Sequence, residues 1–286
     1  MTPQKHPPWL RVKIGNREQF VRMRQVVETH HLHTVCENAS CPNIGECWGR
    51  GTATFMILGN RCTRDCRFCD VLPGQPEKVD ADEPRRVAEA VRLLALKHAV
   101  ITSVTRDDLP DGGAHIWAET IRQIRARNPE CRIEALIPDF QGDEVSLGLV
   151  FDAQPDILGH NLETVPRLYP IARPQADYQQ SLHVLRRAKE ADLTTKSGIM
   201  LGMGETIEEI RVVMRDLRAN KCDILTLGQY LQPTRAHIPI ERYWTPEEFQ
   251  QLKANGEELG FLHVEAGPLV RSSYHADQIP VNTGIF

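Results

Sequence analysis

The sequence predicts an α/β fold: a partial (β/α)6 barrel of the TIM-like kind, with an N-terminal extension and a short C-terminal tail. The first observation is that short runs of β-favouring residues alternate with stretches in which apolar residues recur at helical spacing. Such alternation implies a parallel sheet with right-handed crossovers. The second observation is that six strand–helix units are recognisable, which is too few for the eight units of a closed barrel.

The strands are predicted from short β-favouring runs and the turn residues that end them. Thr54 to Leu58 is an apolar run that stops at Gly59, and 99–105 is a second run rich in Val, Ile and Thr. Both are short enough to be strands rather than helices. The remaining predicted strands cover 132–137, 156–162, 194–200, 223–227 and 261–266.

The helices are predicted from apolar spacing and end signals. Between 83 and 97, Val87, Val91 and Leu94 recur at helical spacing. A helix over 113–128 should stop before Pro129, because the residue before proline disfavours the helical conformation. Thr245 can cap a last helix that has Pro246 at its first position. The other predicted helices cover 143–151, 177–191 and 206–219.

Length and charge limit the classes of function. A chain of 286 residues can bury one large core, and α/β barrels of this size commonly form one domain. The 34 basic and 38 acidic residues give a net charge of −4, so nucleic acid is not an expected partner. No apolar run approaches the ~18 residues of a membrane span, so no membrane partner is expected either.

Six of the eight cysteines form two triplets within 34 residues. Cys36, Cys41 and Cys47 (the N-terminal triplet) have the spacing C-x4-C-x5-C, and Cys62, Cys66 and Cys69 (the loop triplet) have C-x3-C-x2-C. Three thiolates leave one iron of a cubane cluster without a cysteine ligand. Such an iron can bind a substrate or cofactor. The loop triplet directly follows the first predicted strand, and active sites of parallel barrels form at that end of the strands.

Two other interpretations of the cysteines remain open. A disulfide framework is disfavoured because no apolar signal segment opens the chain and disulfides belong mainly to oxidising compartments. Structural zinc fits poorly because each triplet is odd, although His30, His31 and His33 could supply nitrogen ligands. These histidines fit the polar end of a helix better. Cys131 and Cys222 lie in apolar stretches and are expected in the core.

The loop triplet, with Phe68 just before its third cysteine, resembles the signature of the radical S-adenosylmethionine (SAM) superfamily. The resemblance implies a partial barrel of the radical SAM type. It also implies a [4Fe–4S] cluster on Cys62, Cys66 and Cys69, whose fourth iron binds the amino and carboxylate groups of SAM. Cleavage of SAM then gives a 5′-deoxyadenosyl radical that abstracts hydrogen from an unactivated carbon.

The N-terminal triplet, followed by Trp48, resembles the auxiliary-cluster motif of the lipoyl synthase family, and 271–276 (RSSYHA) resembles its C-terminal element. The resemblance implies a second [4Fe–4S] cluster held by Cys36, Cys41, Cys47 and Ser273. A weakly held alkoxide is easier to displace from iron than a thiolate. Further matching stretches are 105–113, 134–140, 159–164, 196–202 and 228–233. We therefore expect an extension at 1–50, a barrel at 51–266 and a tail at 267–286.

This resemblance implies a sulfurtransferase that inserts two sulfur atoms at C6 and C8 of a protein-bound octanoyl-lysine, using two SAM and the sulfur of the auxiliary cluster. The implied partners are octanoylated lipoyl carrier domains or the glycine cleavage H protein, and an electron donor such as ferredoxin or flavodoxin. Free thiols require a reducing compartment, so a cytoplasmic enzyme is expected. The alternative is another radical SAM enzyme whose auxiliary cluster serves electron transfer or substrate anchoring.

Some polar and glycine residues at strand ends are candidates for SAM binding. Gly112 and Gly113 let backbone approach a ligand, or they only form the turn before helix 113–128. Asn161 and Glu163 could bond the ribose. Lys196 lies in a predicted apolar strand, so it either pairs with a carboxylate, of SAM or of Glu134, or sits at an exposed strand end. Arg271 is expected to anchor the serine turn or to pair with a carboxylate.

Overall fold

A computed structural model describes residues 7–12, 15–274 and 276. Its main sheet has eight strands in the order β1-β2-β5-β6-β7-β8-β9-β10. The two-residue strand β1 (His33–Thr34) is antiparallel to β2, and the other seven strands run parallel. No described strand joins β1 to β10, so the barrel is open. The parallel strands are β2 (Thr54–Ile57), β5 (His98–Ser103), β6 (Arg132–Leu136), β7 (Ile157–Gly159), β8 (Thr195–Leu201), β9 (Ile224–Gln229) and β10 (His263–Gly267).

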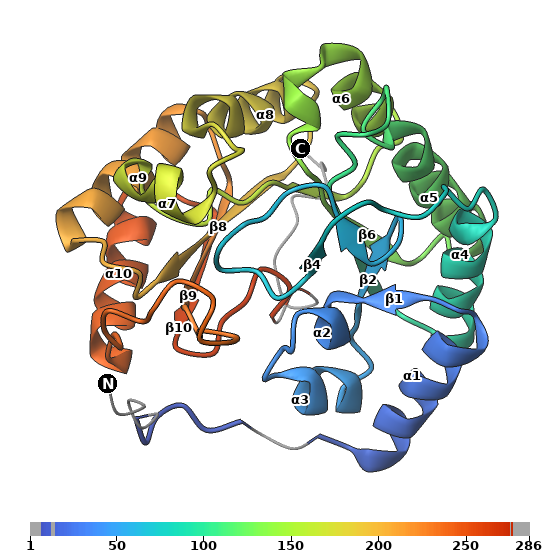
Figure 1. The fold of residues 1–286 in the computed structure, drawn as a ribbon, viewed down its shortest axis with the longest axis horizontal. Helices are drawn as coiled ribbons and strands as arrows, with labels where there is room; N and C mark the ends of the chain where they lie inside the picture. The colour runs from blue at the N-terminus through green and yellow to red at the C-terminus, as the bar shows by residue number, and fades with distance from the viewer. Residues whose placement is uncertain (1–6, 13–14, 275, 277–286) are drawn as a thin grey trace.

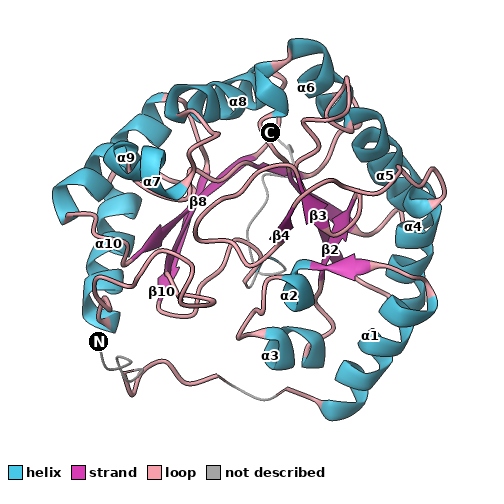
Figure 2. Ribbon diagram, viewed as in Figure 1, coloured by secondary structure: helices cyan, strands magenta, loops and turns pink. Residues whose placement is uncertain are grey.

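A long helix follows each of the first six parallel strands, and together these six helices form the outer ring of the barrel (Figures 1 and 2). The predicted alternation of strands and helices is therefore confirmed. Each helix buries one apolar stripe against the sheet. In the first of them, the stripe includes Val87, Val91 and Leu94. The six helices are α4 (Glu83–Leu94), α5 (Ala114–Arg127), α6 (Glu144–Phe151), α8 (Tyr178–Glu190), α9 (Ile207–Ala219) and α10 (Pro246–Glu258).

The main differences from the predicted ranges have local causes. The helix expected to reach residue 97 ends at Leu94, because Ala95 adopts a left-handed conformation with φ of 51°. The strand expected to reach residue 162 ends at Gly159, and Glu163 takes a φ of 66° before it meets Ile199 in an isolated bridge. The Thr245 cap is confirmed, since its side chain accepts the Glu248 N–H in a capping box.

The N-terminal extension folds into helices that the sequence did not reveal. They are α1 (Arg17–Thr29), α2 (Val35–Asn38) and α3 (Ile44–Gly49). The side chain of Asn16 caps α1 by accepting two backbone N–H bonds. Gly15 and Gly49 let α3 approach the start of α1, because a Cβ on Gly49 would lie 2.5 Å from the Gly15 Cα. In Figure 1, α2 and α3 lie between the two edges of the open sheet.

The remaining short elements lie in loops at the carboxyl ends of the strands. β3 (Arg61–Cys62) pairs with β4 (Leu72–Pro73), and α7 (Tyr169–Ala172) follows a 3-10 turn at Pro166–Leu168. A second 3-10 turn covers Phe140–Gly142. Among the described helices, none has the length and apolarity to cross a bilayer.

Candidate active site

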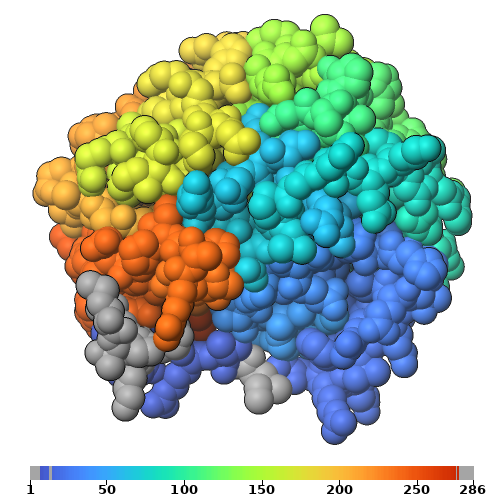
Figure 3. All heavy atoms as spheres, viewed as in Figure 1, coloured from blue at the N-terminus to red at the C-terminus, as the bar shows by residue number. Residues whose placement is uncertain are grey.

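The loop triplet lies in residues 59–73, which we call the cysteine loop. Leu58 and Gly59 turn the chain out of β2 with φ values of 68° and 93°. The β3–β4 pair and a bond from the Gly74 N–H to the Cys62 carbonyl close the base of the loop. In Figure 3 the cysteine loop (light blue to cyan) lies near the middle of the face formed by the strand-end loops. This is the placement expected for an active site of a parallel barrel.

The thiols of each triplet lie close enough to influence one another. Burial raises the pKa of Cys66 to about 11 and of Cys69 to about 12, and the neighbouring thiols of the loop triplet add to both shifts. Burial and the other two thiols of its triplet likewise raise the pKa of Cys47 to about 12. All eight cysteines are free. A thiol with a raised pKa loses its proton on gaining a positive partner such as iron.

Each triplet offers three free thiols to a metal centre. Among the described residues, no group of three or more His, Cys, Asp or Glu side chains is arranged around one metal ion. In a cubane cluster each cysteine binds a different iron, so the sulfur atoms need not converge on a point. Each set of three thiols would bind three irons of such a cluster and leave the fourth iron for another ligand.

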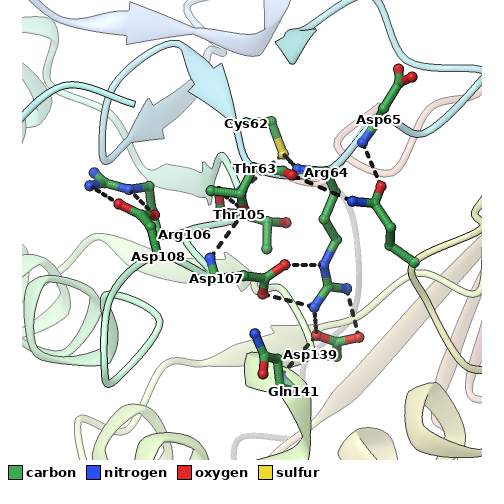
Figure 4. Close-up of polar contacts among 11 residues, drawn as sticks. Cys62, Thr63, Arg64, Asp65, Thr105, Arg106, Asp107, Asp108, Asp139 and Gln141 are labelled. Carbon is green, nitrogen blue, oxygen red and sulfur yellow. Dashed lines mark hydrogen bonds and ion pairs between the residues drawn. The ribbon is translucent and has the colours of Figure 1, made fainter. Parts of the chain in front are cut away.

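Arg64, inside the C-x3-C segment, clamps the cysteine loop to two other loops (Figure 4). Its Nε and Nη2 donate to Asp107 at 2.7 and 3.0 Å, and its Nη1 and Nη2 donate to Asp139 at 2.9 and 2.7 Å. The Asp139 side chain is fully buried. Burial opposes the charge of Asp139, yet the guanidinium lowers its pKa to about 2. The clamp thereby joins the loops that follow β2, β5 and β6.

The backbone around Cys62 is bonded to the same neighbouring loop. The Cys62 Sγ accepts the N–H of Arg64 at 3.4 Å and that of Thr105 at 3.3 Å. Thr63 bonds the Thr105 carbonyl through both its N–H and its hydroxyl, and the hydroxyl accepts the Asp107 N–H (Figure 4). The position of Cys62 is thus set by the turn after β5.

The other side of the cysteine loop meets α7 and the loop that follows β9. The Arg67 N–H donates to Ala172, the Arg67 carbonyl accepts the Ile238 N–H, and the His237 Nε2 lies 3.0 Å from the Cys69 carbonyl oxygen. Phe68 packs against the apolar cluster on this side of the barrel. A polar pocket of about 390 Å³ opens beside the clamp, lined by Arg64, Asp107, Gln141, Pro174, Gln175, Ala176, Asp177 and Gln180.

Gly112 and Gly113 form the turn before α5, with φ values of 58° and 87°. A Cβ on Gly112 would lie 2.8 Å from the Phe140 ring, and one on Gly113 would lie 2.5 Å from the Leu58 side chain. The prediction that the two glycines form the turn before this helix is therefore confirmed. Their contact with SAM stays a prediction.

Asn161 and Glu163 lie where the cysteine loop faces β8. The Asn161 Nδ2 donates to Glu163 at 3.1 Å, and Arg173 donates to the Asn161 and Leu162 carbonyls at 2.9 and 3.1 Å. Burial raises the pKa of Glu163, while Arg173 and Asn161 oppose that rise. The charge of Glu163 in turn acts on Cys66 and Cys69. Glu163 is thus close to the loop triplet, and Asn161 is bonded to Glu163. Their contact with SAM stays a prediction.

Lys196 is buried in β8, so the prediction of an exposed strand end is wrong. Its Nζ lies 2.7 Å from the Glu134 Oε1, and the His98 Nε2 lies 3.3 Å from the Glu134 Oε2. Burial opposes the charge of Glu134, but Lys196 and His98 together hold its pKa below the usual value. Lys196 and His98 come from the amino-terminal ends of their strands, whereas the cysteine loop follows the carboxyl ends. The assignment of Lys196 to SAM stays a prediction.

The N-terminal triplet is built from two short helices and one loop, with Cys36 in α2, Cys47 in α3 and Cys41 between them. The Cys41 N–H donates to the Cys36 carbonyl. Ser40 joins this segment to the cysteine loop through a 2.5 Å bond to Asp70. The two triplets therefore lie next to each other. Of the three histidines upstream, His30 ends α1, as predicted for a polar helix-end residue, whereas His33 lies in the strand β1.

The C-terminal tail reaches the N-terminal triplet. Asn43 Nδ2 donates to the Leu269 carbonyl at 2.6 Å, and the Tyr274 hydroxyl lies 3.3 Å from the Glu46 carboxylate. Arg271 is close enough to Cys41 for their charges to interact, although burial lowers the pKa of Arg271. A bond from the Tyr274 N–H to the Arg271 carbonyl closes a turn that contains Ser273. His275, in the predicted motif, lies outside the described residues.

The sequence did not single out Arg64, Asp107, Asp139, Arg173 or His237. Arg64 could have been noticed because it is a charged residue between two cysteines of one loop. A buried arginine needs a carboxylate, but the sequence does not say which of the chain's acidic residues it meets.

Comparisons with known proteins agree with this geometry. The Radical SAM superfamily model matches residues 56–217, more than half of the chain. The chain is 57% identical over 274 residues to the lipoyl synthase of Rubrobacter xylanophilus, covering 95% of this chain and 85% of that protein. It is 54% identical to the lipoyl synthase of Chlorobaculum tepidum, covering 96% of both chains.

Solved structures show the same fold at low sequence identity. Methylornithine synthase (PylB) matches with a TM-score of 0.56 and 14% identity, covering 73% of this chain and 69% of that one. HydG, a maturase of the [FeFe]-hydrogenase, matches with a TM-score of 0.58 and 18% identity, covering 79% of this chain and 59% of that one.

Proposed function

The chain belongs to the lipoyl synthase family of radical SAM enzymes, and from that premise we propose which residues hold the cofactors and what each does. Membership makes it a sulfur-inserting radical SAM enzyme that uses SAM and iron–sulfur chemistry. The number of clusters, their ligands and the protein substrate are the parts that we propose.

The first cluster is held by Cys62, Cys66 and Cys69, and its remaining iron is open to SAM. When bound, cluster and SAM supply the abstraction of hydrogen from unactivated carbons, which a general base cannot perform because these C–H bonds are not acidic. The protein binds and orients the cofactors. The buried thiols would become iron ligands, two N–H bonds hold the Cys62 sulfur, and Arg64 holds the loop in place.

The auxiliary cluster is held by Cys36, Cys41, Cys47 and Ser273, and its sulfur goes to the substrate. The observation that supports this is the contact between the tail and the N-terminal triplet, because Asn43 and Glu46 of that segment bond Leu269 and Tyr274 on either side of Ser273. The division of the chain at residues 50 and 266 stays a prediction. The same contacts support treating the extension and tail as one auxiliary site.

The substrate is an octanoyl chain on a lysine of a lipoyl carrier domain or of the glycine cleavage H protein, which receives sulfur at C6 and C8. A ferredoxin or flavodoxin supplies electrons. The name of the relatives, lipoyl synthase, supports a lipoyl carrier as the protein substrate. Membership of the Radical SAM superfamily supports the need for an electron donor. Eight free thiols support a reducing compartment such as the cytoplasm.

Anaerobic reconstitution tests the proposal. We expect about eight irons per chain, and about eight sulfides. With SAM, dithionite and an octanoyl-lysine peptide, mass spectrometry should show a chain that gains two sulfur atoms. Eight irons with SAM cleavage but no sulfur gain would instead favour an auxiliary cluster used for electron transfer or substrate anchoring. Zinc without iron would contradict both.

Ser273→Ala separates the two clusters. This variant should still cleave SAM, because the loop triplet is intact, but sulfur insertion should fall by more than about tenfold since one auxiliary ligand is lost. The measurement is 5′-deoxyadenosine and lipoyl product in the same reaction. Normal lipoyl formation would reject Ser273 as a ligand.

A further inference from the structure

The turn at residues 270–274 (the tail turn) contacts residues near each of the two cysteine triplets. On one side, Tyr274 approaches Glu46 beside Cys47, and Arg271 is near Cys41. On the other side, the Ser272 Oγ accepts a bond of 2.6 Å from the Asn161 Nδ2, across 111 residues of sequence. Two adjacent serines of one turn are thus available to two different sites.

The tail turn is fixed by contacts that do not involve Ser272. A Cβ on Gly228 would lie 2.0 Å from the Val270 carbonyl oxygen, so β9 accepts the tail only because that residue is glycine. Asn43 bonds Leu269, and Ala276 is buried with Val100, Ile157 and Ile224 inside the barrel. Removing the Ser272 hydroxyl should therefore leave the backbone of the turn in place.

Asn161 is held by two partners. A side-chain amide has two N–H donors and one acceptor oxygen, and Nδ2 of Asn161 donates to Ser272 at 2.6 Å and to Glu163 at 3.1 Å. Its Oδ1 lies close to Gly198, because a Cβ added to that glycine would be 3.0 Å from this oxygen. With both donors committed, the amide cannot rotate freely, and the oxygen stays available to accept a bond from a hydroxyl group.

We propose that Ser272 is a positioning residue for SAM: it fixes the amide of Asn161 so that the Asn161 oxygen is ready to accept a ribose hydroxyl. The inference rests on the proposed function of the site, in which SAM binds beside the loop triplet and Ser273 serves the auxiliary cluster, and on the sequence prediction that Asn161 bonds the ribose. The two serines therefore divide their roles, since Ser272 acts on SAM affinity and Ser273 on the auxiliary cluster.

The test is SAM binding to the reconstituted, unreduced enzyme by equilibrium dialysis, a condition in which SAM is not cleaved. Ser272→Ala should weaken binding by about three- to tenfold, the effect of one hydrogen bond, and should keep its full iron content. Ser272→Thr, which retains the hydroxyl, should bind like the parent, whereas Ser272→Val, of similar shape, should bind like Ser272→Ala. Ser181→Ala is the control, because it removes a hydroxyl bond of 2.9 Å in α8.

A double-mutant cycle separates positioning from a general effect of the tail. In an Asn161→Ala background, Ser272→Ala should have no further effect on the Kd for SAM. The inference would be overturned by an unchanged Kd for SAM in Ser272→Ala, or by the same loss of SAM affinity in both backgrounds. It would also be overturned if both Ser272→Ala and Ser272→Val failed to load two clusters. Lipoyl formation by the parent enzyme tests the proposed function separately, because the Kd comparison does not depend on sulfur transfer.

Discussion

The two cysteine triplets are alike in composition but differ in how the chain holds them. The loop triplet lies within one turn after β2 and is fixed by charged side chains, above all by Arg64 between Asp107 and Asp139. The N-terminal triplet lies on short helices and is completed by the far end of the chain, through Asn43 with Leu269 and Glu46 with Tyr274. One site is thus part of the barrel, whereas the other depends on two chain ends meeting.

This difference fits two distinct tasks. A cluster that must cleave SAM repeatedly benefits from rigid surroundings. A cluster proposed to give up its sulfur needs ligands that can dissociate from the iron. One amide–carbonyl bond at 2.6 Å and one hydroxyl–carboxylate bond at 3.3 Å are weaker constraints than a buried guanidinium with two carboxylates.

The largest effect should come from removing one ligand of each triplet in turn. Cys66→Ala should abolish SAM cleavage, while Cys36→Ala should retain SAM cleavage and abolish sulfur insertion. Either variant should hold about four irons in place of about eight. Iron content, 5′-deoxyadenosine and lipoyl product are measured on the same preparation. Loss of SAM cleavage in both variants would show that the two sites are not separable.

Breaking the clamp should destabilise the fold. Arg64→Met leaves Asp139 buried and unpaired, so the free energy of unfolding should fall by about 3–5 kcal/mol, measured by urea denaturation. Arg64→Met combined with Asp139→Asn should recover part of this loss, because the uncompensated charge is gone. A loss below about 1 kcal/mol would mean that the clamp does not hold the loop.

The same clamp predicts a pH dependence. The pKa of Asp139 is lowered to about 2, so it binds a proton less readily in the folded than in the unfolded chain. Its contribution, roughly 2 kcal/mol, is therefore fully present above about pH 5 and is lost as the pH falls towards 2. The Asp139→Asn variant should lack this part of the acid dependence. Unfolding free energies of parent and variant that change in parallel between pH 6 and 3 would contradict the assignment.

The smallest effect concerns the chain ends. Asn43→Ala removes the bond to Leu269 and should weaken the binding of the C-terminal tail to the N-terminal extension by about 1 kcal/mol. The auxiliary cluster should then lose iron several-fold faster to a chelator, while the SAM cluster is unchanged. Thr245→Ala, a cap distant from both sites with a similar cost, is the control. Equal rates of iron loss from Asn43→Ala and Thr245→Ala would remove the distinction between the two triplets.

The sequence by itself determined what depends on residues close to one another. The strands, the ring helices and the Thr245 cap follow from short-range periodicity and end signals. The spacing of the cysteines predicted two triplets and the place of one of them after β2. Even here the ends of α4 and β7 shifted, because the backbone conformations of Ala95 and Glu163 leave no mark on apolar spacing.

Only the tertiary structure decided which distant groups meet. Arg64 finds partners 43 and 75 residues away, and Ser272 meets Asn161 across 111 residues. Lys196 needed a carboxylate partner, and the structure places its Nζ 2.7 Å from the Glu134 Oε1. A buried charge or amide requires a partner, and that requirement is visible in the sequence. The identity of the partner is set by how the sheet curves and where the tail enters it.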